Sequence, residues 1–114
     1  MVRQSYVPEA GDLVWLSFNP QSGHEQAGRR PALILSPRLY NAKARLAIAC
    51  PITSQPKGYP FEVPLPDDAN ITGVVLADHV KSVDWEARQI EFASTVSADL
   101  LTDVRERLRV LLEL

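Results

Sequence analysis

Residues 12–37 read DLVWLSFNPQSGHEQAGRRPALILSP, and this stretch determines how the rest of the chain is interpreted. Two apolar runs, residues 13–18 and 32–35, flank a polar loop that contains glycine. The first run is apolar at alternate positions on both sides, which predicts a central strand covered on both faces. Residues 31–35 are predicted to form a second strand. The connection, residues 19–30, is long for a hairpin, and long loops in compact domains are usually functional or disordered.

Downstream of this stretch the pattern is again mostly that of strands. Ser36 followed by Pro37 is typical of a helix start, so a short helical turn through about residue 42 is expected. Residues 81–86 are expected to form a turn, and the further strands are predicted at residues 45–53, 61–65, 73–80 and 88–93. From Ser97 the apolar period becomes helical, with one face formed by Leu100, Leu101, Val104, Leu108, Leu111 and Leu112.

Residues 45–53, RLAIACPIT, alternate regularly between two faces. One face is predicted to join the core and consists of Leu46, Ile48, Cys50 and Ile52. The other face has small side chains and ends in a hydroxyl, so a ligand or a second subunit can approach it closely; it consists of Ala47, Ala49, Pro51 and Thr53. These elements together predict a mainly β fold: a small barrel, or strongly bent antiparallel sheet, with a short helix and a C-terminal α-helix packed on it. Residues 1–114 are expected to form a single domain.

Composition excludes several classes of protein. No apolar run approaches the roughly 20 residues that a membrane span requires, and the first residues contain no apolar stretch of a secretory signal. The single cysteine, Cys50, excludes an internal disulfide framework. A cytoplasmic location is expected. The net charge of −2 is unevenly distributed, because residues 1–60 carry seven Lys and Arg against three Asp and Glu, whereas residues 61–114 carry five against eleven. This asymmetry is compatible with a basic face that binds phosphate, and also with chance scatter over a solvated surface.

The residue types in the loop suit phosphate chemistry. Cleavage of RNA without a metal requires a base for the 2′-hydroxyl proton, positive charge for the phosphorane and an acid for the leaving 5′-oxygen. Glu25 is the candidate base, Arg30 the candidate for stabilising phosphate oxygens, and Thr53 a further hydrogen-bond donor. Arg30 is a poor general acid because guanidinium retains its proton to a pKa above about 12. His24 could supply an acid near neutral pH, but a solvated loop histidine is the favoured interpretation of this residue by itself.

Five further candidates lie outside that trio. Arg29 and Lys57 could bind phosphate, or be ordinary surface cations. Asp78, followed by His79 at a predicted strand end, could bind a base edge or simply belong to a turn. Trp15 and Trp85 could stack on bases, but a place in the core or an interface is favoured for both. No cluster of His, Cys, Asp and Glu has metal-ligand spacing, so no metal and no cofactor are expected.

Four segments resemble the MazF/PemK family of toxins: YVPEAGDLVWLSFNPQSGHEQAGRRPALILSP, then YN, then PITSQPKGYPFEV, then GVVLADHVKSVDW. The resemblance implies an SH3-like barrel with a C-terminal helix, a homodimer, and metal-independent cleavage of single-stranded RNA to 2′,3′-cyclic phosphate and 5′-hydroxyl ends. The family's catalytic Glu, Arg and Thr fall on Glu25, Arg30 and Thr53. In the PemK/Kid branch a catalytic Asp falls on Asp78, but the Arg that accompanies it falls on Leu76.

The resemblance also implies a cognate antitoxin whose disordered C-terminal tail covers the RNA site. An acidic, partly apolar tail would suit Arg29, Arg30 and Lys57 and would fold on binding. Two alternatives from other classes are a CcdB-like gyrase-binding toxin and a non-catalytic RNA- or peptide-binding barrel. The gyrase poisons end in Trp-Gly-Ile, whereas this chain ends Leu-Glu-Leu. The dimer contact is expected at the small face of residues 47–51 or at the terminal helix.

Overall fold

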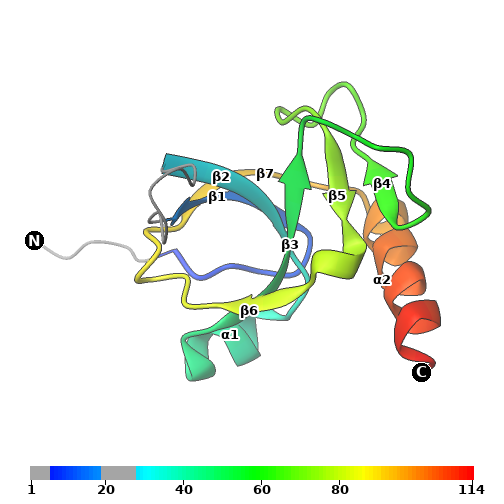
Figure 1. The fold of residues 1–114 in the computed structure, drawn as a ribbon. Helices are drawn as coiled ribbons and strands as arrows, with labels where there is room; N and C mark the ends of the chain where they lie inside the picture. The colour runs from blue at the N-terminus through cyan, green and yellow to red at the C-terminus, as the bar shows by residue number, and fades with distance from the viewer. Residues whose placement is uncertain (1–5, 19–27) are drawn as a thin grey trace, which may run out of the picture.

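A computed structural model of the chain describes residues 6–18 and 28–114. The fold is mainly β, as predicted, with two α-helices and one short 3-10 helix (Figure 1). The strands are β1 (Asp12–Phe18), β2 (Gly28–Ile34), β3 (Ala47–Thr53), β4 (Glu62–Pro64), β5 (Val74–Leu76), β6 (Lys81–Val83) and β7 (Glu91–Thr95). The helices are α1 (Arg38–Ala44), the 3-10 helix Ala77–His79 and α2 (Ala98–Leu112).

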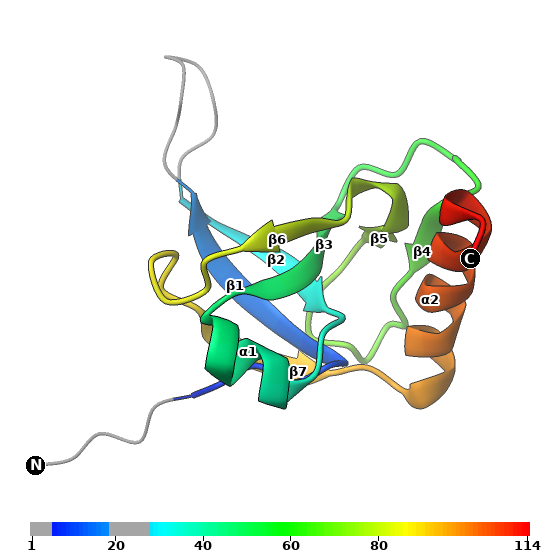
Figure 2. The same cartoon turned by 90° about the horizontal axis from the view of Figure 1, so that it is seen from below.

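All strand pairs are antiparallel and follow the order β4-β5-β3-β2-β1-β7, with β6 pairing β3 beside this path. In the described part of the chain the end strands β4 and β7 do not pair, so the sheet is strongly bent but not closed. This confirms the bent antiparallel sheet with a C-terminal helix. α2 lies on the side of β4 and β5, whereas α1 lies well away from it; Figures 1 and 2 agree on this.

β1 is a central strand covered on both faces, as its apolar alternation predicted. Leu13 joins a core cluster with Leu33 and Cys50, and α2 contributes Val104 to the same cluster. The adjacent residue, Val14, points the other way into a second cluster with Ala32, Ala47 and Trp85. Because successive side chains of a strand point to opposite faces, one strand serves both clusters. Trp85 is almost fully buried, so the preference for a place in the core is confirmed.

β3 corrects the expected division into a core face and a small open face. Ala47 and Ala49 are buried in the second core cluster, which also contains Leu16 and Trp85, whereas Pro51 and Thr53 are half-buried. The side chains small enough for close approach are thus used by the fold itself over the first half of the strand. The open part of this face is limited to its last residues. Leu46, predicted to join the core, precedes the strand and is exposed.

The start of α1 differs from the prediction. The cap residue is Pro37, and Ser36 does not cap the helix. Instead the Ser36 hydroxyl donates to Oδ1 of the buried Asn41 at 2.5 Å and accepts from the Ile48 amide at 2.8 Å. The Ser36 hydroxyl, which the sequence pattern predicted to cap α1, therefore forms hydrogen bonds to Asn41 and Ile48 instead.

Several strand boundaries also differ. β2 begins at Gly28 and not at residue 31, so Arg29 and Arg30, predicted to lie in the loop, belong to the strand that pairs with β1. The predicted strand 73–80 is divided into β5 and the 3-10 helix, and the predicted turn 81–86 begins with β6. β7 starts at Glu91 and not at residue 88, because the Asp84 side chain and backbone accept from the amides of Ala87 and Arg88 and hold a turn there.

In α2 the Ser97 cap is confirmed, since its hydroxyl accepts from Leu100 N at 3.1 Å. Leu111 and Leu112, predicted to continue the apolar face of α2, are exposed.

Candidate active site

Arg30 and Thr53 line the same open cavity of about 530 Å³. Arg30 lies near the start of β2 and Thr53 is the last residue of β3. These strands are antiparallel and pair Ala32 with Pro51. Arg30 lies two residues before Ala32 and Thr53 lies two residues after Pro51, so both are at the same end of the strand pair. Trp15 forms part of the wall, and the remaining polar lining comes from Ser54, Gln55, Asn70 and Thr72.

The loop before β5 can form a wall of this cavity only because residue 73 is glycine. A Cβ atom on Gly73 would lie 2.2 Å from the carbonyl oxygen of Thr53, and the residue has a φ of +137°. Both the close approach and the backbone conformation exclude an ordinary side chain. Gly73 therefore brings residues 70–72 against the end of β3, beside the predicted catalytic Thr53.

Arg29 lines the same cavity, but its guanidinium is engaged within the fold. Nη1 donates to Ser17 Oγ and to the Gln89 carbonyl, each at 2.7 Å, and Nη2 forms an ion pair with Glu91 at 3.1 Å. These contacts connect β2 to β1 and to the turn before β7. Arg29 and Arg30, adjacent in the sequence, thus have different surroundings.

A smaller cavity of about 170 Å³ adjoins the first. Thr53 and Gln55 line both, so the two cavities form one continuous surface. The smaller one also brings together Lys57 and Asp78, two residues predicted to bind RNA, with Tyr59 and His79. Asp78 and His79 approach each other, with 3.9 Å between Oδ1 and Nε2. Five of the seven predicted site residues therefore line this pair of cavities.

The other two predicted site residues, His24 and Glu25, lie outside the described residues. They belong to the connection between β1 and β2, whose flanking residues Phe18 and Gly28 pair with each other. The prediction that Glu25 is the base therefore stays a prediction. Arg30 and Thr53 lie together in the structure, whereas the assignment of the proton acceptor rests on the sequence alone.

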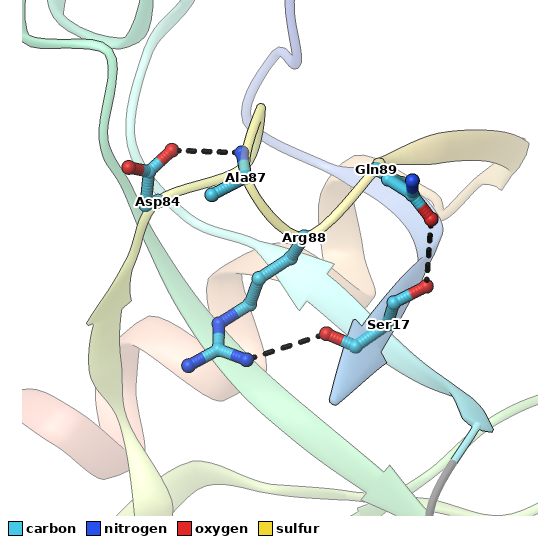
Figure 3. A pocket seen from close by; sticks show the side chains of 5 residues that line it. All are labelled: Ser17, Asp84, Ala87, Arg88 and Gln89. Atoms are coloured by element: carbon cyan, nitrogen blue, oxygen red, sulfur yellow. Dashed lines mark hydrogen bonds between the residues drawn. The ribbon is translucent and has the colours of Figure 1, made fainter. Parts of the chain in front are cut away.

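A third cavity, of about 370 Å³, was not foreseen from the sequence. It is lined by Ser17, Asp84, Ala87, Arg88 and Gln89 (Figure 3). Arg88 donates to the Ser17 carbonyl at 3.3 Å, and its guanidinium lies 4.6 Å from the centre of the Phe18 ring. Lys81 Nζ lies 5.1 Å from the same ring. The only signal in the sequence was the presence of two cations near the predicted turn, which does not indicate that they meet Phe18.

The cations that line these cavities differ in their partners. Within residues 6–18 and 28–114, no carboxylate lies within 4.0 Å of the cationic groups of Arg30, Lys57 and Arg88, or of Lys81, which shares the Phe18 ring with Arg88. Ion pairs with Asp or Glu engage Arg29 in the larger cavity and, away from the cavities, Arg38, Arg45, Arg107 and Arg109. The cavities therefore keep positive charge that is not already paired with described residues, which suits an anionic ligand.

No three His, Cys, Asp or Glu side chains among the described residues come together as a metal ion would require. No described helix is long and apolar enough to cross a membrane.

Comparison with known proteins gives a consistent family assignment. Residues 9–112 match the model of the family described as PemK-like, MazF-like toxin of type II toxin-antitoxin system. The chain is 47% identical over 107 residues to the endoribonuclease toxin MazF of Escherichia coli K12, covering 94% of this chain and 96% of that one. It is 34% identical over 117 residues to the Escherichia coli endoribonuclease PemK, covering 98% and 87%.

A solved MazE–MazF structure from Deinococcus radiodurans matches the fold with a TM-score of 0.92 and 56% identity, over 96% of this chain and 99% of the matched chain. Sequence and fold therefore agree over nearly the whole length. The chain belongs to the PemK-like, MazF-like family of type II toxin–antitoxin toxins.

Proposed function

We propose that this chain is a sequence-specific endoribonuclease, the toxin of a type II toxin–antitoxin system, that cleaves single-stranded messenger RNA without a metal ion. The observation that carries the proposal is the cavity shared by Arg30 and Thr53, whose cation is not paired with a described carboxylate. The relatives named endoribonuclease toxin MazF and endoribonuclease PemK support the reaction class.

The reaction requires the RNA's own 2′-hydroxyl. Its oxygen attacks the adjacent phosphorus, the bond from phosphorus to the 5′-oxygen breaks, and the products carry a 2′,3′-cyclic phosphate and a 5′-hydroxyl. Glu25 is assigned as the base that takes the 2′-hydroxyl proton. The Arg30 guanidinium donates to the non-bridging oxygens as negative charge develops on them, and the Thr53 hydroxyl donates to the same group.

The proton for the leaving 5′-oxygen has two candidate sources, His24 and Arg30. Guanidinium holds its proton too tightly to be a good acid at neutral pH, which favours His24. Replacement of His24 by Gln distinguishes them, because loss of the acid lowers kcat and removes one limb of the pH profile of kcat, whereas a solvated histidine changes neither.

The proposed partners follow from the relatives. MazF of Deinococcus radiodurans is solved as a complex with MazE, so we infer a cognate antitoxin for this chain. A segment with acidic and apolar residues would match Arg30 and Lys57 and the apolar wall at Trp15 and Ile52. We further infer a homodimer that acts in the cytoplasm, where messenger RNA is translated, so that cleavage inhibits growth.

The test is to incubate the antitoxin-free protein with a long mixed-sequence RNA in EDTA and to map the new 5′ ends. Cuts at one short motif with 5′-hydroxyl ends are expected from the wild type and not from Glu25→Gln or Arg30→Ala. Lys43→Ala, an exposed cation on α1, is the matched control and should cleave normally. Intact cleavage in both site variants contradicts the residue assignment. Absence of cuts by the folded wild type contradicts the enzyme, and a gyrase supercoiling assay then tests the CcdB-like alternative.

A further inference from the structure

The turn between β3 and β4 is closed by one carboxylate. Glu62 Oε2 accepts a hydrogen bond from the Lys57 amide and Oε1 accepts one from the Gly58 amide, each at 2.9 Å. The Glu62 amide in turn donates to the Tyr59 carbonyl at 3.1 Å. Both carboxylate oxygens and the backbone of residue 62 are thus used to hold residues 57–59 in one conformation.

The geometry of this turn is that of a backbone anion site. Two successive N–H groups converge on one anion, which is the arrangement called a nest. Gly58 has a φ of +84°, a conformation that glycine adopts without strain and that allows both amides to point the same way. In this chain the anion is internal, because Glu62 supplies it.

Glu62, which holds this turn, is fixed by strand pairing and lines the smaller cavity. Glu62 is the first residue of β4 and pairs with Leu76 of β5, and the Ala77 amide donates to the Phe61 carbonyl at 3.0 Å. Leu76 and Asp78 line one side of the smaller cavity, whereas Lys57 and Tyr59 line the side formed by the turn. Residue 62 therefore connects the turn, through its carboxylate, to β5, through strand pairing.

A carboxylate is otherwise an unfavourable neighbour for RNA, because it repels phosphate. Its presence among the residues that line this cavity requires a role that outweighs the repulsion. Two charge-assisted hydrogen bonds to backbone amides supply one, since such bonds are stronger than neutral ones and fix the loop before the ligand arrives.

We propose that Glu62 is a positioning residue for RNA: its carboxylate holds the turn at residues 57–59 so that Lys57 and Tyr59 face Asp78 and His79 across the smaller cavity. This inference rests on the proposed RNA-cleaving function. Glu62 does not touch the scissile phosphate in this proposal. Its effect is on binding, because a loop that must be ordered by the substrate lowers affinity without changing the groups that perform the reaction.

The structural half of the proposal is tested by amide hydrogen exchange. In Glu62→Ala the amides of Lys57 and Gly58 lose their acceptor, so both should exchange at least tenfold faster than in the wild type. Glu62→Gln retains one acceptor oxygen and no charge, and should fall between the two. Glu106→Ala, which removes a carboxylate of the same charge on α2, should leave both amides unchanged. Unchanged exchange in Glu62→Ala overturns the proposal.

The functional half is tested by steady-state cleavage and by binding to an RNA with a 2′-O-methyl group at the cleavage site. For Glu62→Ala we expect KM and Kd to rise about tenfold while kcat changes less than twofold, with Glu62→Gln intermediate. Faster amide exchange with unchanged KM and Kd, or an equal fall of kcat in all folded variants, overturns the proposal. If the wild type does not cleave RNA, the proposed function fails, whereas exchange and Kd still decide the role of Glu62.

Discussion

Arg29 and Arg30 have the same side chain and adjacent positions and line the same cavity, yet their partners differ. Arg29 donates to Ser17 and Gln89 and pairs with Glu91, whereas no described carboxylate pairs with Arg30. Residue type alone assigns both to phosphate, but the contacts assign Arg29 to the fold.

This contrast predicts opposite effects of two alanine substitutions. Arg29→Ala removes three connections between strands and should lower the free energy of unfolding by about 1–2 kcal/mol, with cleavage within a few-fold of the wild type. Arg30→Ala should leave stability within about 0.5 kcal/mol and lower kcat/KM by about 100- to 1,000-fold. Urea unfolding and initial rates on one RNA measure both quantities. A larger loss of kcat/KM in Arg29→Ala than in Arg30→Ala would contradict the division of roles.

Cys50 gives a prediction about pH. Burial raises the pKa of the Cys50 thiol to about 12, and the nearby charge of Asp78 adds to the shift. The folded state therefore binds the thiol proton more tightly than the unfolded state. This contribution to stability is complete below the pKa of an unfolded cysteine, about 8.5, and is lost progressively as the pH rises toward the folded value.

A thiol reagent tests this directly. At pH 8 the folded protein should not react with a disulfide reagent over minutes, and the protein in urea should react fully. Between pH 9 and 10 the free energy of unfolding should fall more steeply in the wild type than in Cys50→Ala, by up to about 1.4 kcal/mol per pH unit. Rapid reaction of the folded protein at pH 8, or equal slopes in both proteins, would show that the thiol is not protected by burial.

At the scale of elements, α1 is held by a buried side chain and not by its cap. Asn41 is fully buried, and its Nδ2 donates to the carbonyls of Pro8 and Ser36 at 2.8 and 2.9 Å. The indole of Trp85 donates to the Asn41 carbonyl at 3.2 Å. One residue thus connects the N-terminal segment, α1 and the turn after β6.

Replacement of Asn41 by Ala should therefore lower the stability of the protein strongly, although α1 has only seven residues and most of them are exposed. It leaves two buried carbonyls without a donor and opens a cavity, so the free energy of unfolding should fall by about 3 kcal/mol. Lys43→Ala, on the exposed side of α1, should change it by less than about 0.5 kcal/mol. Urea titration followed by tryptophan fluorescence measures both. A loss below about 1 kcal/mol in Asn41→Ala would contradict the role given to this network.

The elements that could be predicted are those whose apolar pattern is strong and local. β1, β2 and α2 follow from period-two and helical alternation, and the cap at Ser97 follows from residue type. The predictions were wrong where the role of a side chain depends on residues of other elements. Ser36 was expected to cap α1 but bonds Asn41 and Ile48, and the face of Ala47 and Ala49 was expected to be open but is buried in the second core cluster.

The candidate site divides in the same way. The resemblance and residue chemistry pointed to Arg30, Thr53, Lys57 and Asp78, and the structure gathers all four along two adjoining cavities. The cavity at Ser17 and Arg88 was not predictable, because it joins segments about 70 residues apart in the sequence. Glu62 was missed for a different reason: its partners Lys57 and Gly58 are close in the sequence, but its residue type does not show that the carboxylate accepts two backbone amides.

At the scale of the whole molecule, the net charge of −2 conceals a local excess of positive charge. Ion pairs with described carboxylates occupy five arginines, of which Arg29 lines the larger cavity. Arg30, Lys57 and Arg88 line the cavities without such a pair, and Lys81 lies beside Arg88 over the Phe18 ring, also without one. Unpaired cations bind phosphates more strongly than neutralised ones, because they have no internal partner to give up. An acidic chain can therefore bind RNA through a restricted face.

This arrangement predicts the salt dependence of RNA binding. If four cations per chain each contact one phosphate of a single strand, the logarithm of the association constant should fall against the logarithm of salt concentration with a slope of about −3. The measurement uses fluorescence anisotropy with an RNA blocked by 2′-O-methyl at the cleavage site. Lys57→Ala and Arg88→Ala should each make the slope shallower by about 0.7, because each removes one phosphate contact. Lys43→Ala and Arg29→Ala should leave it unchanged, the first because it is remote and the second because Glu91 already neutralises it. An equal effect of all four substitutions would mean that net charge, and not the unpaired cations beside the cavities, governs binding.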